Sequence, residues 1–191
     1  MVLFLKKKSI NYYEKGDKMK KILGDTRRQM ILKWLKEAEA PISGNQLAQK
    51  TNVSRQVIVQ DISLLKAGNE PIMATPQGYI YAKETSYTGE RRVIAVKHTK
   101  EQAAEELNIL VDHGVSIIDV IVDHPIYGEI TASLHLKSRF DVEKFVRKLQ
   151  TTGATMLSGL TDGTHLHTIE ADTKEQLEQA IKALDKAGFL I

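Results

Sequence analysis

A chain of 191 residues with 42% hydrophobic content is long enough for two small domains or one domain of medium size. It contains no cysteine, which excludes disulfide bonds and thiolate metal sites. No apolar run of about 18 residues is present, so we expect no membrane-spanning segment. The apolar start at residues 1–5 precedes its lysines and has no small-residue cleavage site after it. A secretory signal is therefore not expected, and the sequence indicates a cytoplasmic protein.

The net charge of +3 is unevenly distributed along the chain. Residues 1–24 hold seven lysines and two acidic residues, and residues 25–83 hold eight basic and five acidic ones. Residues 84–191 hold twelve basic and seventeen acidic residues, together with all six histidines. A basic first half suits the phosphates of DNA, whereas an acidic second half does not. This asymmetry predicts a DNA-binding domain joined to a sensor domain.

Residues 1–24 have no apolar periodicity and carry two lysine clusters, so we expect little ordered structure in this leader. One interpretation is a basic arm that enters the DNA minor groove. We favour the other interpretation, in which Met19 is the true start, because residues 15–18 could be encoded by a purine-rich ribosome-binding sequence.

Three helices are expected after the leader. Apolar residues form one helical stripe across residues 25–38. Ser43 is a suitable cap for a second helix that continues to residue 50, and Ser54 for a third helix over residues 55–66. The exposed side of the third helix would carry the groups that contact base edges in the major groove. These DNA-binding candidates are Ser54, Arg55, Gln56, Val59 and Gln60.

A short hairpin is expected after the third helix. Residues 72–74 and 79–81 read as two strands around the turn sequence TPQG. Helix, helix, turn, capped helix and hairpin in this order predict a winged helix-turn-helix over residues 25–83. A plain three-helix bundle without DNA-binding function is the alternative, and the charge asymmetry argues against it.

Residues 90–191 alternate between strand and helix patterns. Strands are expected at residues 93–98, 115–122, 130–136 and 165–171, and helices at residues 99–114, 141–150 and 173–186. The short connection between the second and third strands implies antiparallel pairing. This order predicts an α+β domain with helices over one face of a mainly antiparallel sheet.

The sequence HLH on the last expected strand is the sharpest chemical feature. Alternation along a strand would point His165 and His167 to the same side, with Leu166 facing the core. His98, together with Glu105 or Glu106, could complete a site for zinc, nickel or a similar ion. A pair of exposed strand histidines without metal is the alternative interpretation.

The sequence HPIYGE at residues 124–129 is a second candidate site. Proline and glycine shape a turn around His124, Tyr127 and Glu129, and such groups can converge on a ligand. The equally strong alternative is a hairpin corner whose polar groups bond to the backbone.

These motifs together resemble a known family. They are ISG at residues 42–44, SRQVIVQDI at residues 54–62, His98 with Thr99, HPIYGE at residues 124–129, and GTHLHTI at residues 163–169. Their order is similar to that in the niacin-responsive repressors of NAD biosynthesis and niacin uptake, whose C-terminal half is called the 3H domain. The resemblance covers residues 19–191.

The resemblance implies a homodimeric repressor that binds double-stranded operator DNA when nicotinic acid is abundant, with a divalent metal ion, nickel or zinc, in the 3H domain. Carried onto this sequence, the metal ligands would be His98, Glu106, His165 and His167. The metal and the corner of His124, Tyr127 and Glu129 would together hold the anionic pyridine carboxylate.

Two other functions stay open at this point. A metal-responsive repressor would use the ion itself as the signal. A metal-dependent enzyme acting on a nicotinate-like compound would use the ion to activate water. No second general base is evident, and a fused DNA-binding domain favours sensing, so we expect no enzymatic activity.

Overall fold

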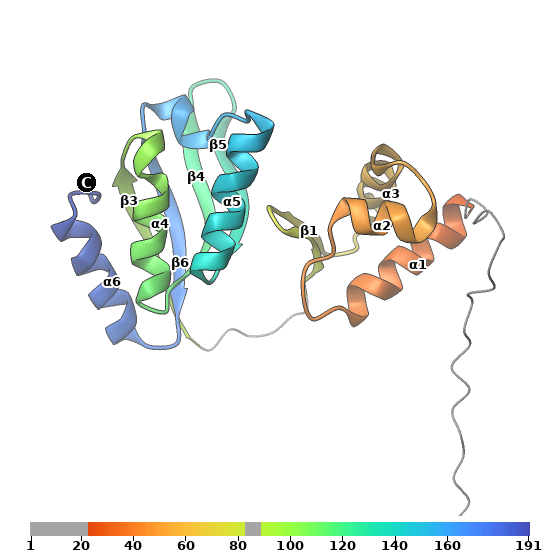
Figure 1. The fold of residues 1–191 in the computed structure, drawn as a ribbon, viewed down its shortest axis with the longest axis horizontal. Coiled ribbons are helices and arrows are strands. Elements are labelled where there is room, and N and C mark those ends of the chain that lie inside the picture. Colours follow the sequence, from red (N-terminus) through yellow and green to blue (C-terminus); the bar gives the residue numbers. More distant parts are fainter. Residues whose placement is uncertain (1–22, 83–88) are drawn as a thin grey trace, which may run out of the picture.

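The computed structural model describes residues 23–82 and 89–191, so the expected leader lies outside the described residues except for its last two (Figure 1). Each half of the chain has its own hydrophobic core, one centred on Leu35 and Ile58 and the other on Leu110 and Ile117. Within the described residues, no helix combines the length and the apolar character needed to cross a membrane.

The first half begins with three helices, α1 (Gly24–Glu37), α2 (Gly44–Thr51) and α3 (Arg55–Ala67). The Ser43 hydroxyl accepts a bond from the Gln46 backbone N–H, and the Gln46 side chain accepts one from the Ser43 N–H, which fixes the start of α2. The Ser54 hydroxyl likewise accepts from the N–H of Val57 at the start of α3. Between α2 and α3, Asn52 takes the left-handed φ of 51° that this tight turn requires. The expected helices and serine caps are confirmed.

The wing is the antiparallel hairpin of β1 (Ile72–Thr75) and β2 (Gly78–Tyr81). Ile42 and Tyr79 exchange two backbone hydrogen bonds of 3.0 and 2.9 Å, which join the hairpin to the loop before α2. Gly78 has a φ of 149°, and a Cβ at this position would lie 2.5 Å from the Ile42 carbonyl oxygen. Only glycine allows this approach, so the wing packs as part of the helical unit.

The second half is built on a four-stranded antiparallel sheet with the order β3-β6-β4-β5. These strands are β3 (Glu90–Lys97), β4 (Ser116–His124), β5 (Gly128–Leu136) and β6 (Thr164–Ala171). Figure 1 shows α4 (Ala103–Asp112), α5 (Arg139–Thr152) and α6 (Lys174–Lys186) side by side over one face of the sheet. The expected α+β class is confirmed. The 3-10 helix η1 (Lys100–Gln102) precedes α4, and a second one, η2 (Leu157–Thr161), precedes β6 and was not predicted.

One detail of the predicted sheet is wrong. We expected Leu166 to face the core, with the two flanking histidines on the opposite side. Instead, His165 and His167 share the helix-covered face of β6 with the fully buried Ile169, and Leu166 is only half-buried. Because all three helices pack on the histidine side, both imidazoles lie inside the protein.

Candidate functional site

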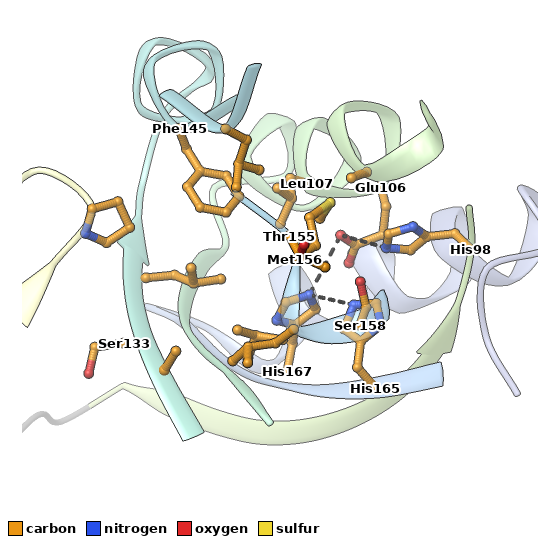
Figure 2. A pocket seen from close by; sticks show the side chains of 17 residues that line it. His98, Glu106, Leu107, Ser133, Phe145, Thr155, Met156, Ser158, His165 and His167 are labelled. Atoms are coloured by element: carbon orange, nitrogen blue, oxygen red, sulfur yellow. Dashed lines mark hydrogen bonds and ion pairs between the residues drawn. The ribbon is translucent and has the colours of Figure 1, made fainter. Parts of the chain in front are cut away.

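Four polar side chains meet between the sheet and α4, and we call them the four-residue cluster: His98, Glu106, His165 and His167 (Figure 2). The histidines of β6 point to one side because they occupy alternate positions of a strand. His98 directly follows β3, whose pairing with β6 ends at Lys97. Gly163 allows this approach, since a Cβ there would lie 2.4 Å from the His98 carbonyl oxygen. No member of the cluster is more than 7% exposed.

The backbone fixes the orientation of all three imidazoles. Nδ1 of His98 lies 2.7 Å from the Thr99 carbonyl oxygen, Nδ1 of His165 2.9 Å from that of Gly163, and Nδ1 of His167 2.6 Å from that of Asp119. A carbonyl oxygen can only accept, so each Nδ1 carries the proton and donates it. In the neutral form of each ring, Nε2 therefore presents its lone pair. The Nε2 atoms of His165 and His167 face each other at 3.1 Å.

Glu106 is fully buried at the centre of the cluster, and neither of its carboxylate oxygens has a hydrogen-bond partner among the described residues. Its Oε2 lies 3.7 Å from Nε2 of His167 and 4.0 Å from Nε2 of His98. Desolvation raises the pKa of Glu106 to about 8. Burial lowers the pKa of His165 to about 4 and that of His167 to about 3. The contact of Glu106 with His167 is therefore not an ion pair at neutral pH, because both groups are mainly uncharged.

The donor set of the cluster could hold a divalent cation. Three imidazole nitrogens and one carboxylate are ligands that zinc and nickel accept. Ligand atoms at opposite ends of a tetrahedral angle around zinc are roughly 3.3 Å apart, close to the 3.1 Å between the two Nε2 atoms of β6. Within residues 23–82 and 89–191, no group of three or more histidine, aspartate or glutamate side chains has the arrangement that a bound ion requires. Binding of an ion would therefore require these side chains to move.

The cluster forms one end of a cavity with a volume of about 230 Å³. Figure 2 shows Phe145 at the opposite end, with Leu107 and Met156 between them and Ser158 beside His165. Most of the remaining wall is aliphatic: Pro76, Ala103, Val120, Ala132, Leu134, Leu149 and Leu157. A site that is apolar along its length and polar at one end can hold a small aromatic ring with one anionic substituent.

The structure separates the other candidates from this cavity. Glu105 is exposed, which leaves Glu106 as the carboxylate that can join the histidines. His124, Tyr127 and Glu129 lie at the tip of the β4–β5 hairpin and do not line the cavity. Nδ1 of His124 accepts bonds from the backbone N–H groups of Ile126 and Tyr127, as in the alternative of a backbone-bonded corner.

Sequence analysis missed the contribution of η2. This five-residue segment supplies Leu157 and Ser158 to the cavity wall, and Ser158 is only 6% exposed. A short 3-10 helix has no apolar periodicity that a sequence pattern could reveal.

The DNA-binding candidates lie together on the first turns of α3. Ser54, Arg55, Gln56 and Gln60 are exposed, and Val59 is half-buried. The helix is held against α1 by the buried carboxylate of Asp61, which accepts a bond of 2.6 Å from Arg27 and one of 3.3 Å from Arg28. This anchoring leaves the opposite side of α3 available for a DNA groove.

Comparison with known proteins matches both halves of the chain. Residues 27–80 match the HTH domain family, and residues 91–191 match the 3H domain family. Over 173 residues the chain is 49% identical to the transcription repressor NadR of Bacillus subtilis, a match that covers 90% of this chain and 96% of that protein. Over 171 residues it is 44% identical to the probable transcription repressor NiaR of Thermotoga maritima, with coverage of 90% and 97%. The chain therefore belongs to this family of transcription repressors, in which an HTH domain precedes a 3H domain.

Proposed function

We propose that this protein represses genes of NAD biosynthesis and niacin uptake, with nicotinic acid as the co-repressor. The acid would bind in the cavity beside a divalent ion, zinc or nickel, held by the four-residue cluster. The observation that carries the sensing role is the convergence of three buried imidazoles and one buried carboxyl group at the polar end of an apolar cavity. Membership of a family of transcription repressors supports the DNA-binding role.

The chemistry of the cluster supports a bound cation. The three Nε2 atoms can act as ligands, because the Nδ1 atom of each ring is already bonded to a carbonyl oxygen. Glu106 would become the fourth ligand by releasing its proton when the cation binds. The carboxyl oxygens of Glu106 are buried without a hydrogen-bond partner among the described residues, which is costly, and a cation would bind them together with the three imidazoles. A divalent ion there would supply the positive charge that an acidic domain otherwise lacks for an anionic ligand.

The rest of the cavity supports a pyridine carboxylate as the ligand. Phe145, Leu107 and Met156 offer apolar surface to the faces of a flat ring. At the polar end, the buried Ser158 hydroxyl lies beside His165 and can donate to a carboxylate (Figure 2). These contacts orient the ring along the cavity and keep water away from its faces.

DNA binding by a homodimer is part of the proposal. A single winged domain makes few phosphate contacts, so two copies gain affinity by presenting two α3 helices about one DNA turn, roughly 34 Å, apart. Nicotinic acid would raise operator affinity if it bound this arrangement more tightly than others.

The test is operator binding by the full chain. Duplexes are selected from a random library with zinc and nicotinic acid present, and their dissociation constants are then measured by fluorescence anisotropy with and without each component. Binding should tighten at least about tenfold only when both are present, and nicotinamide, which lacks the carboxylate, should have little effect. No response of the zinc-loaded protein to nicotinic acid would refute the proposal. Full tightening by zinc alone would instead identify a metal-responsive repressor.

A further inference from the structure

The tip of the wing reaches the sensor cavity. Pro76, in the turn between β1 and β2, lines the same cavity as Glu106. Its carbonyl oxygen accepts a hydrogen bond of 2.8 Å from Nζ of Lys148 on α5, and β1 lies against β5. In Figure 1 the hairpin carrying β1 extends from the helical unit toward the sheet. The DNA-binding half therefore supplies part of the wall of the cavity in the other half.

We propose that the wing couples ligand binding in the cavity to the orientation of the DNA-binding half. A molecule that fills the cavity packs against Pro76 and holds the DNA-binding half in one orientation. This inference rests on the proposed function, because nicotinic acid is the expected occupant. An occupant that touches Pro76 loses this contact when the wing moves away, so it binds the docked arrangement more tightly. By linkage, the occupant then increases the population of that arrangement.

Without a molecule in the cavity, the contact between the wing and the sheet-containing half is only weakly stabilised. Beside Pro76, both polar atoms of the Gln77 side-chain amide are buried and have no hydrogen-bond partner among the described residues. Gln77 lines a groove shared with Arg55 of α3 and with Lys148 and Thr152 of α5. A buried amide without partners disfavours the arrangement that buries it. A small additional contact energy from a molecule in the cavity would therefore raise the population of the docked arrangement.

A change at the wing is transmitted to the recognition helix. The two backbone bonds between Tyr79 and Ile42 connect the wing to the loop that leads into α2, and Gly78 permits their close approach. Arg55, the first residue of α3, lines the same groove as Lys148 but remains exposed. Docking thus sets the orientation of α3 relative to the sheet while its DNA-facing side chains stay accessible.

The experiment compares Lys148→Met with the matched control Lys144→Met, which removes the same charge from an exposed position one turn earlier on α5. The chain has no cysteine, so Gln29→Cys on α1 and Lys182→Cys on α6 can carry a pair of spin labels. Labelled full chain is mixed with an excess of unlabelled chain and loaded with zinc. Label distances are measured by pulsed electron paramagnetic resonance with and without nicotinic acid.

Nicotinic acid should narrow the distance distribution in the parent and in Lys144→Met, but not in Lys148→Met. The tightening of operator binding by nicotinic acid should be at least about fivefold smaller in Lys148→Met than in the parent or in Lys144→Met. Equal narrowing and an equal operator response in Lys148→Met would overturn the inference. Calorimetric titration of the same samples with nicotinic acid distinguishes failure of the proposed function from failure of the inference. If nicotinic acid does not bind to the parent, the proposed function is refuted and the inference with it. If nicotinic acid binds normally but does not narrow the distance distribution of the parent, the inference alone is refuted.

Discussion

Replacing Glu106 by glutamine should stabilise the metal-free protein. The pKa of Glu106 is about 8 in the fold, compared with 4.5 as its ordinary value, so this carboxylate takes up a proton when the chain folds near neutral pH. One pKa unit corresponds to about 1.4 kcal/mol, so the cost of folding at pH 7 is about 3 kcal/mol. The cost is near zero below pH 4.5, grows as pH rises and levels off above about pH 8. Glutamine has a similar shape and never ionises, and its amide can donate to the imidazole nitrogens of the cluster.

The assay is urea unfolding in the presence of a chelator at pH 7 and pH 5. The stability difference between Glu106→Gln and the parent should be about 3 kcal/mol at pH 7 and about 1 kcal/mol or less at pH 5. The lowered pKa values of His165 and His167 destabilise both proteins in acid, so the difference between the proteins is the quantity to compare. Glu105→Gln, at the exposed neighbouring position, should change stability little at either pH. A Glu106→Gln protein that is less stable than the parent at pH 7, or a difference independent of pH, would refute the reasoning.

Three further predictions concern the DNA-binding half and the cluster. Asp61→Ala removes the buried carboxylate that pairs with Arg27 and Arg28 and should lower the free energy of unfolding by about 3–5 kcal/mol in urea titrations. An effect below about 1 kcal/mol would contradict the role of this carboxylate. Gly78→Ala places a methyl group against the Ile42 carbonyl and should cost roughly 1–3 kcal/mol by the same assay, whereas unchanged stability would show that the wing can move away from the helices. His165→Ala should weaken zinc binding at least about 100-fold in competition with a chromophoric chelator, and an unchanged affinity would remove His165 from the set of ligands.

Features encoded within a few residues were predictable from the sequence. The caps Ser43 and Ser54 accept bonds from backbone N–H groups three residues away, so the starts of α2 and α3 were located correctly. Strand alternation correctly placed His165 and His167 on one side of β6, because that periodicity is a property of any strand.

Features that depend on distant packing were not predictable. Which face of β6 is buried depends on where α4, α5 and α6 pack, so the positions of the histidines and Leu166 relative to the core were reversed. The contact between Lys148 and Pro76 joins residues 72 positions apart, and no local pattern encodes it. Similarly, His124 and Tyr127 are close in sequence, but only the fold shows that they lie outside the cavity.

The central claim is that the four-residue cluster and nicotinic acid share one site. The most direct measurement is the visible absorption spectrum of the full chain loaded with cobalt(II), which responds to the ligands of the ion, during a titration with nicotinic acid. The spectrum should change and saturate at the same nicotinic acid concentration that tightens operator binding, and nicotinamide should not reproduce the change. Operator binding that tightens while the cobalt spectrum stays unchanged would contradict the account, because the ligand would then act away from the cluster.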